Sequence, residues 1–167
     1  VAMQNYPVLN SSLDETAQEI ILKGSYNIGI ATATPDGLTV PVVHDADKLS
    51  LFDLARRIAE LSVKARDNKL TLPDMQNGTF TLTSIGSIGG IFSAPIINHP
   101  EVAIMGIQKI EKRPVVRNDQ IVIREMCYLS ISCDHRVVDG SDAALFMKDV
   151  ISYLEAPIRL LATTQVQ

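Results

Sequence analysis

A chain of 167 residues is long enough to bury a sizeable hydrophobic core, and 46% hydrophobic with 20% charged residues is typical of one globular domain. The net charge of −4, without a cluster of Lys and Arg, argues against a nucleic-acid-binding surface. No run of about 18 apolar residues is present, so the sequence predicts no membrane span. The chain begins with Val1 in a segment typical of mid-domain structure, so we expect an upstream part to be missing.

Short strands are predicted in the first quarter of the chain. Two apolar, β-branched runs at 19–23 and 26–33 are interpreted as strands that could pair as a hairpin. Residues 35–37, Pro-Asp-Gly, predict a turn, because proline fixes φ and glycine accepts positive φ. A third strand is predicted at 38–43, and residues 10–14 are interpreted as a turn. Together these elements favour antiparallel strands at the start of the chain.

The clearest helix is predicted at 50–68. Ser50 and Asp53 have the spacing of a capping box, with aspartate in place of the usual glutamate. Apolar residues recur with helical periodicity, and Pro73 closes the segment. The basic residues of this helix are interpreted as a solvated face, with phosphate binding as the alternative: Arg56, Arg57, Lys64 and Arg66.

A glycine-rich loop at 84–90 follows a predicted strand at 79–83. It lacks both the Gly-x-Gly-x-x-Gly pattern of dinucleotide-binding helices and the Gly-Lys-Ser/Thr ending of a phosphate-binding P-loop. Two interpretations remain open on these residues alone. The loop is either a flexible turn between strands or a place where the backbone approaches a ligand closely.

The second half of the chain alternates strands with one long helix. A strand is predicted at 102–110, then a hairpin that turns at 118–119, and then a strand at 126–132. A helix follows at 142–155 and ends at Pro157, after which the chain becomes polar. The pattern indicates a mixed α/β domain with several antiparallel strands.

The candidate catalytic group is His135, which lies between the last strand and the last helix. It begins the pattern His135-x-x-x-Asp139-Gly140. A neutral imidazole can accept a proton near pH 7, so His135 is a candidate general base; a structural His–Asp pair is the alternative. A Cys133–His135 dyad is disfavoured, because alternate residues of a strand lie about 7 Å apart. No histidine or cysteine spacing typical of a metal site occurs.

With this pattern the chain resembles the catalytic core of the dihydrolipoamide acyltransferases, in the superfamily that includes chloramphenicol acetyltransferase. Further segments match that core in the same order: 6–10, 27–31, 35–38, 41–43, 80–90, 95–104 and 132–136. The resemblance implies an α/β fold, a two-layer sandwich of mixed β-sheet with helices on one face, assembled as a trimer. It also implies that residues 1–167 form a single acyltransferase catalytic domain, incomplete at its N-terminus relative to the family.

The resemblance assigns roles to three catalytic residues. His135 would take the proton from the thiol of coenzyme A, and the hydroxyl of Thr83 would stabilise the tetrahedral oxyanion. Asp139 would hold the loop in shape by ion pairing. In the family His135 and Thr83 come from neighbouring subunits. The loop after Thr83 would then approach the acyl and pantetheine groups through Ser84, Gly86, Gly89 and Gly90.

The resemblance also implies substrates, partners and a compartment. Coenzyme A is expected as a substrate, the lipoyl group is expected on a separate domain, and no metal is expected. The expected partners are two further copies in a homotrimer (which could form a larger shell), the lipoyl domain, and decarboxylase and dihydrolipoamide dehydrogenase subunits; no nucleic acid or membrane is expected. The expected location is the cytoplasm, or the mitochondrial matrix in a eukaryote.

Two departures from the family pattern concern the pocket. Ser84 stands where asparagine is usual, and Cys133 stands where an aromatic or small residue is usual. Both could change the shape of the acyl pocket. Two other functions are alternatives: a free-standing acetyltransferase for a small hydroxylated molecule, and a non-catalytic trimeric scaffold.

Overall fold

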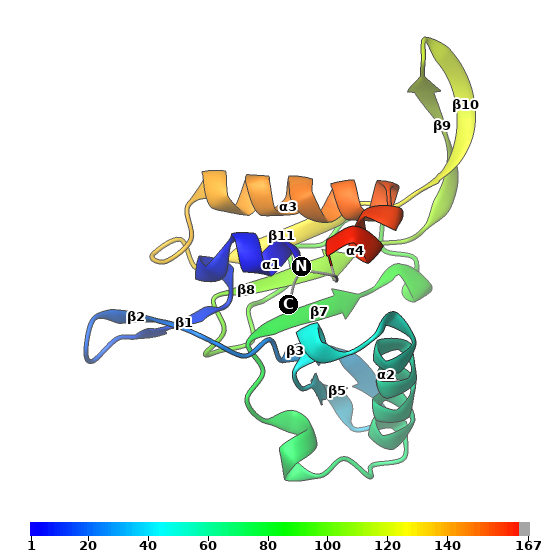
Figure 1. The fold of residues 1–167 in the computed structure, drawn as a ribbon. Coiled ribbons are helices and arrows are strands. Elements are labelled where there is room, and N and C mark those ends of the chain that lie inside the picture. Colours follow the sequence, from blue (N-terminus) through cyan, green and yellow to red (C-terminus); the bar gives the residue numbers. More distant parts are fainter. Residues whose placement is uncertain (164–167) are drawn as a thin grey trace.

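A five-stranded mixed sheet forms the centre of the protein, in a computed structural model that describes residues 1–163 (Figure 1). The strand order is β11-β8-β7-β3-β6. β7 is parallel to both of its neighbours, β8 and β3, whereas the edge strands β11 and β6 are antiparallel to theirs. The five strands are β3 (Ile28–Ile30), β6 (Val42–Val43), β7 (Phe80–Ser84), β8 (Ala103–Ile107) and β11 (Leu129–Cys133).

Helices α1 (Ala2–Asn5) and α3 (Gly140–Glu155) lie against one face of this sheet (Figure 1). The core between the two layers contains Phe80 from β7 and Phe146 from α3, whose rings meet edge to face with centroids 5.8 Å apart. Such aromatic pairs add to the free energy of burying the rings. This arrangement confirms the predicted mixed sheet with a helical layer.

Helix α2 (Leu51–Arg66) packs near the β6 edge and contacts β4 (Thr32–Thr34). Its start is confirmed, because the Ser50 hydroxyl accepts a 3.1 Å hydrogen bond from the backbone N–H of Asp53. The remaining helical segments are short: α4 (Ile158–Thr163) and the 3-10 turns η1 (Pro7–Leu9), η2 (Ala46–Lys48), η3 (Leu72–Met75) and η4 (Gly86–Ile88). No helix within residues 1–163 is long and apolar enough to cross a membrane.

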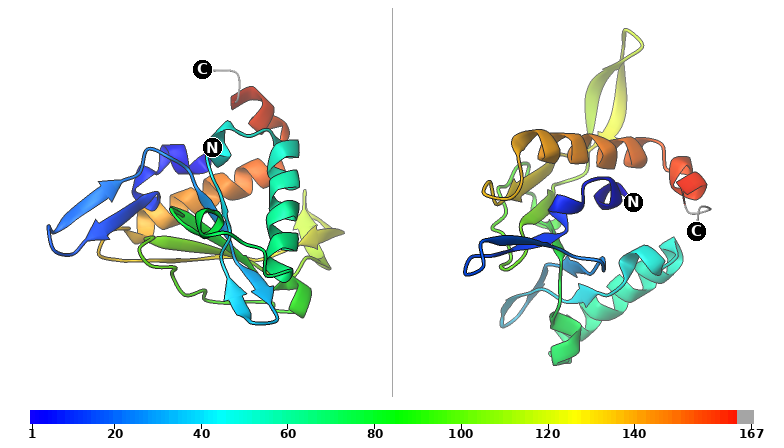
Figure 2. Two further views of the ribbon diagram at one scale, coloured as in Figure 1. Left: turned by 90° about the horizontal axis from the view of Figure 1, so that it is seen from below. Right: turned by 60° about the vertical axis from the view of Figure 1, so that its left-hand side comes forward.

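Three antiparallel hairpins lie outside the central sheet: β1 (Ser11–Asp14) with β2 (Glu19–Leu22), β4 with β5 (Gly37–Thr39), and β9 (Glu111–Arg117) with β10 (Gln120–Met126). The first and third project away from the body (Figure 2). The predicted turn at 118–119 is confirmed, since both Asn118 and Asp119 have positive φ, at 50° and 60°. The helix predicted at 142–155 is also confirmed and begins two residues earlier, at Gly140.

The predicted hairpin of 19–23 with 26–33 is wrong. β2 pairs instead with β1, in a stretch interpreted as a turn. The polar residues of β1 give no strand pattern in the sequence, although Ser11 and Ser12 are buried. The Asn10 side chain donates to the carbonyls of Lys23 and Ser25, which holds the chain after β2 against the start of β1.

Other boundaries also differ from expectation: the strand predicted at 26–33 is divided into β3 and β4, and the strands predicted at 102–110 and 126–132 are the shorter β8 and β11. The single strand predicted at 38–43 is divided into β5 and β6, because Pro41 lies between them and has no N–H to donate to a ladder. For the segment after Pro157 only a polar tail was expected, and residues 158–163 form α4. The rest of that tail, 164–167, lies outside the described residues.

Candidate functional site

The loop that carries His135 is held at both ends. At its start, the N–H of Asp134 donates to the carbonyl of Val102 at 2.8 Å. The Asp134 carbonyl then accepts from the N–H groups of Val137 and Val138, at 3.0 and 2.9 Å. Val138 is fully buried in the core beneath α3. His135 therefore lies exposed in a turn whose backbone is fixed on both sides.

Charged side chains flank His135 on both sides. The Arg136 guanidinium donates to the Asp134 carboxylate from Nε at 3.0 Å and from Nη2 at 2.7 Å. Its Nη1 donates to Glu15, in the turn of the β1–β2 hairpin, at 2.8 Å. The hydrogen bonds from Arg136 hold the pKa of Asp134 below its ordinary value, so this carboxylate stays charged at neutral pH.

Asp139 is the N-cap residue of α3, and its carbonyl accepts the N–H of Ala143 at 3.1 Å. Its carboxylate is exposed and makes no capping hydrogen bond. The ion pair expected for Asp139 is absent among residues 1–163, where the ion pairs of the motif loop belong to Asp134 and Arg136. Within this chain Asp139 therefore shapes the loop through its backbone, and a negative charge at a helix N-terminus is favourable.

Cys133, next to the loop, packs toward the hydrophobic core rather than toward the exposed loop. Burial, with a smaller contribution from the Asp134 charge, raises the pKa of its thiol. A thiol with a raised pKa is a poor nucleophile near pH 7. The structure therefore does not support a Cys133–His135 dyad. The cysteine at position 133, which departs from the family pattern, packs against the hydrophobic core.

Thr83 lies near the C-terminal end of β7, half-buried, and pairs in register with Gly106 of β8. Leu82 packs into the core beneath the helices. Because side chains alternate along a strand, Thr83 faces the side of the sheet away from them. Its hydroxyl is therefore outside the core, as the predicted oxyanion role requires.

In the glycine loop after Thr83, the structure explains why two of the positions are glycine. A Cβ at Gly86 would lie 2.8 Å from the carbonyl oxygen of Gln108, so no side chain fits there. Gly89 has a φ of 105°, a region that residues with side chains rarely adopt. The carbonyl of Gly90 accepts the N–H of Lys109 at 3.1 Å, which fixes the loop to the chain beyond β8, while Ser84 and Gly89 are exposed.

A buried amide beside Thr83 was missed by the sequence analysis. Gln108 is 1% exposed, and its Nε2 donates to the hydroxyls of Ser93 and Ser130 at 2.7 and 3.1 Å. It lies over Gly106, the register partner of both Thr83 and Ser130. Its Oε1 has no hydrogen-bond partner among the described residues. The only signal in the sequence for this buried amide was Gly106, a glycine within an apolar strand.

A second buried polar cluster, also missed, lies farther along the same face. The Thr81 hydroxyl donates to the Glu101 carboxyl at 2.7 Å, and the Asn98 side chain donates to its other oxygen at 3.1 Å. Burial raises the pKa of Glu101, and the two hydrogen bonds oppose this shift. These bonds tie the segment before β8 to β7 and so support the strand that carries Thr83.

His135 and Thr83 lie at opposite ends of the sheet within one chain. Thr83 pairs with Gly106, whereas Cys133 pairs with Ala103, three residues earlier on β8. At about 3.3 Å per residue this separates Cys133 from Thr83 by roughly 10 Å along the strands, and two strand spacings add about 10 Å across them. His135 is farther still, beyond the end of β11. The two side chains of one chain therefore cannot act on the same carbonyl group.

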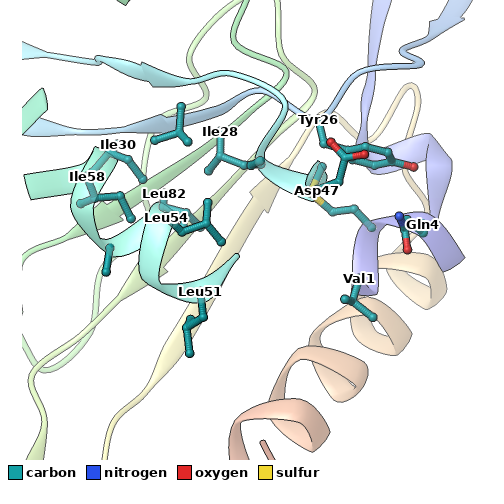
Figure 3. Close-up of a pocket in the computed structure, with 14 residues that line it drawn as sticks. Val1, Gln4, Tyr26, Ile28, Ile30, Asp47, Leu51, Leu54, Ile58 and Leu82 are labelled. Carbon is teal, nitrogen blue, oxygen red and sulfur yellow. The ribbon is translucent and has the colours of Figure 1, made fainter. Parts of the chain in front are cut away.

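An apolar pocket lies elsewhere, between α1, α2 and the helix-side face of the sheet (Figure 3). It has a volume of about 400 Å³ and contains none of the predicted site residues. Ile28, Leu54 and Ile58 point into it, and Leu82 lies in its wall, one residue before Thr83 but on the opposite face. Its lining includes no histidine, cysteine or hydroxyl nucleophile other than the phenol of Tyr26.

Among residues 1–163, no group of three or more His, Cys, Asp or Glu side chains is arranged to hold a metal ion. The groups at the loop and at the end of β7 include the imidazole of His135 and the hydroxyl of Thr83. Such groups fit proton transfer and oxyanion stabilisation.

Comparison with known protein families identifies the chain at family level. A family model described as 2-oxoacid dehydrogenases acyltransferase (catalytic domain) matches residues 1–162. The chain belongs to this acyltransferase family. The resemblance drawn from the sequence motifs is thus confirmed.

Curated members of this family with different acyl groups are about equally similar to the chain. It is 45% identical over 160 residues to the dihydrolipoyllysine-residue succinyltransferase component of the 2-oxoglutarate dehydrogenase complex of Cupriavidus necator. It is 47% identical over 160 residues to the corresponding acetyltransferase component of the pyruvate dehydrogenase complex of Staphylococcus aureus. Each match covers 96% of this chain but only 38% and 37% of the respective relatives, so the chain spans less than two fifths of their length.

Solved acyltransferase structures have the same fold. The dihydrolipoamide acetyltransferase of Azotobacter vinelandii matches with a TM-score of 0.91 and 44% identity, and the cubic core of the pyruvate dehydrogenase multienzyme complex with 0.91 and 43%. Both matches cover 95% of this chain and 65% of the other. Chloramphenicol acetyltransferase matches over 92% of this chain and 72% of its own, with a TM-score of 0.53 and 15% identity, which shows the shared fold alone.

The Azotobacter vinelandii structure is informative about the candidate residues. A serine, a histidine and an asparagine of that enzyme have been investigated for their roles in the catalytic mechanism. Their spacing along the chain is the same as that of Thr83, His135 and Asp139. Position 139 differs in chemistry, because aspartate carries a charge that asparagine lacks.

Proposed function

We propose that this domain transfers an acyl group between a dihydrolipoyl group and coenzyme A within a 2-oxo acid dehydrogenase complex. The observation that carries the proposal is the exposed His135 in a turn held at both ends, in a family whose curated members are acyltransferases. The matching spacing of Thr83, His135 and Asp139 supports the assignment of roles.

The proposed chemistry needs one base and one oxyanion donor. An imidazole nitrogen of His135 accepts the proton of the coenzyme A thiol, and the resulting thiolate attacks the thioester carbonyl of the acyl-dihydrolipoyl group. The hydroxyl of Thr83 donates a hydrogen bond to the negative oxygen of the tetrahedral intermediate. Collapse breaks the bond to the dihydrolipoyl sulfur, which takes the proton back from the imidazolium. The products are acyl-coenzyme A and dihydrolipoamide.

The proposed site is shared between copies of the chain. Because His135 and Thr83 of one chain lie at opposite ends of the sheet, the base of one copy acts with the hydroxyl of another. A cyclic trimer supplies three such pairs and closes on itself. The similarity to the cubic core of the pyruvate dehydrogenase complex supports a trimer that could build a larger shell.

The remaining parts of the proposal concern substrates and partners. Ser84 and the loop glycines Gly86, Gly89 and Gly90 lie directly after Thr83, where the pantetheine arm of coenzyme A would pass. The lipoyl group arrives on a separate domain, and decarboxylase and dihydrolipoamide dehydrogenase subunits complete the complex. The proposed location is the cytoplasm or the mitochondrial matrix. The acyl group is acetyl, succinyl or branched-chain.

Substitution of His135 tests the proposed function. His135→Ala is expected to lower kcat for coenzyme A-dependent acyl transfer by about 10²–10⁴-fold, the usual contribution of a general base. Acetyl-, succinyl- and branched-chain acyl-coenzyme A are each assayed with dihydrolipoamide to identify the acyl group. The thermal unfolding midpoint should stay close to wild type, since the side chain is exposed.

His44→Ala is the matched control. The imidazole of His44 contacts the carbonyl of Pro73 at 3.0 Å and lies outside the proposed site, so kcat should be retained. Near-normal activity of His135→Ala with all three acyl donors would exclude His135 as the base and overturn the assignment.

A further inference from the structure

Arg136 connects two segments that are far apart in the sequence. Two nitrogens of its guanidinium bind the carboxylate of Asp134, on the other side of His135. The third, Nη1, donates to Glu15 at 2.8 Å across 121 positions of sequence. One side chain therefore ties the turn of the β1–β2 hairpin to the loop that presents the proposed base.

The contact is well defined at both of its ends. In the hairpin turn, Oδ1 of Asp14 accepts the N–H groups of Thr16 and Ala17, both at 2.9 Å. In the motif loop, Oδ1 of Asp134 also accepts the backbone N–H of Arg136 at 3.0 Å. The planar guanidinium is thus held by carboxylates on two sides, a geometry that a lysine ammonium cannot reproduce.

Stability does not explain this contact. The Arg136 and Glu15 side chains are 61% and 67% exposed, and an exposed ion pair of this kind contributes about 0–1 kcal/mol to folding. Its consequence is geometric, because it fixes the chain directly after His135. A general base acts only when it lies within about 2.6–3.2 Å of the heavy atom that carries the proton, so a small displacement of this loop lowers the rate.

We infer that Glu15 is a positioning residue that acts through Arg136 to hold the His135 loop in its working geometry. The inference rests on the proposed acyl-transfer function. The β1–β2 hairpin therefore acts on the site through its contact with Arg136.

Steady-state kinetics of Glu15→Ala test the inference. The expected result is a decrease in kcat of roughly two- to fivefold, the most that a pair of about 1 kcal/mol can cause, with the KM for coenzyme A changed by less than about twofold. Arg136→Ala should lower kcat at least as much. The double variant should be no slower than Arg136→Ala alone, since Glu15 acts through Arg136.

Glu155→Ala is the matched control, because Glu155 pairs with Arg117 at 2.9 Å with side chains of similar exposure. Its kcat should equal that of wild type. Unchanged kcat in Glu15→Ala, or additive effects of Glu15→Ala and Arg136→Ala, would overturn the inference.

A readout independent of activity separates this inference from the proposed function. The N–H groups of Val137 and Val138 bind the Asp134 carbonyl, so loosening of the loop by Glu15→Ala should raise their hydrogen exchange rates several-fold. If the wild-type protein shows no acyl transfer, the proposed function fails. Exchange in the loop then still decides the positioning inference, and unchanged exchange rates contradict it.

Discussion

At the scale of single residues, backbone hydrogen bonds form the turn that carries the candidate base. Asp134, Val137 and Val138 form the turn around His135 through their main-chain groups, and the carbonyl of Asp139 opens the helix that follows. The His-x-x-x-Asp pattern therefore does not describe two interacting side chains in this protein. It marks a tight turn from β11 into α3 that leaves the imidazole exposed.

Substitution of Thr83 tests the proposed oxyanion role. Thr83→Val keeps the size of the side chain and removes the hydroxyl, so kcat should fall by about 10²–10³-fold, the cost of losing one oxyanion donor. Thr83→Ser retains the hydroxyl and should restore most of the activity. Steady-state kinetics with thermal unfolding as the check on folding measure both effects. Equal activity of the Val and Ser variants would contradict the role.

At the scale of elements, a buried carboxylate fixes helix α2 to the chain beyond it. Asp74 in η3 accepts hydrogen bonds from Arg57 at 3.1 Å and from Lys64 at 3.3 Å, both on α2. It also accepts the N–H and the hydroxyl of Thr71, at 3.1 and 2.9 Å, which completes a capping box. The basic residues of α2, expected to form a solvated face, therefore divide: Arg57 and Lys64 bind this carboxylate, whereas Arg56 and Arg66 are exposed.

The same carboxylate predicts how stability depends on pH. The hydrogen bond from the Thr71 N–H, opposed by burial and reinforced by the Thr71 hydroxyl and Lys64, lowers the pKa of Asp74 from 3.8 to about 2. Because the folded pKa lies below the unfolded value, the stabilisation is complete above about pH 5 and is lost as the pH falls toward 2. It amounts to about 2 kcal/mol at most.

Urea unfolding between pH 7 and pH 3 measures this contribution. Asp74→Asn should lower the free energy of unfolding at pH 7 and weaken its dependence on pH below 5. Asp67→Asn is the control, since Asp67 forms an exposed pair with Lys69. If Asp74→Asn kept the full acid dependence of wild type, the loss of wild-type stability below pH 5 would have another source.

At the scale of the whole molecule, exposed apolar side chains occur on several elements, among them two segments that flank β8 in the sequence. One is the stretch from Ile88, at the end of η4, to Ile96, and the other is the projecting β9–β10 hairpin (Figure 1). The large exposed side chains of these segments are Ile88, Ile91, Phe92, Ile96, Val116, Ile121 and Ile123. Apolar surface of this kind is typical of interfaces between subunits, which supports the proposed trimer.

Subunit complementation tests the proposed sharing of the site. His135→Ala and Thr83→Val are each expected to be inactive, but a trimer that contains both variants has one site with an intact base and an intact hydroxyl. Dissociation and reassociation of an equal mixture should recover about a quarter of wild-type activity, because random assembly restores one site in each mixed trimer. Light scattering checks the mass of the assembly. No recovered activity in verified mixed trimers would show that both residues act within one chain.

The sequence itself determined the family, the main helices, the turn of the β9–β10 hairpin and the candidate residues. These features depend on local information: capping residues at 50 and 53, hydrophobic periodicity, turn chemistry at 118–119, and a contiguous motif around His135. Patterns of this kind can be recognised in a sequence because each depends on residues within a few positions of one another.

Only the tertiary structure decided how distant segments meet. The pairing of β1 with β2, the amide of Gln108 beside Thr83 and the contact of Glu15 with Arg136 each join residues whose composition gives no sign of a partner. The separation of His135 from Thr83 likewise follows from strand order and register, with β8 between β7 and β11. Register is a property of the assembled sheet, set by long-range packing, and no single stretch of the chain contains it.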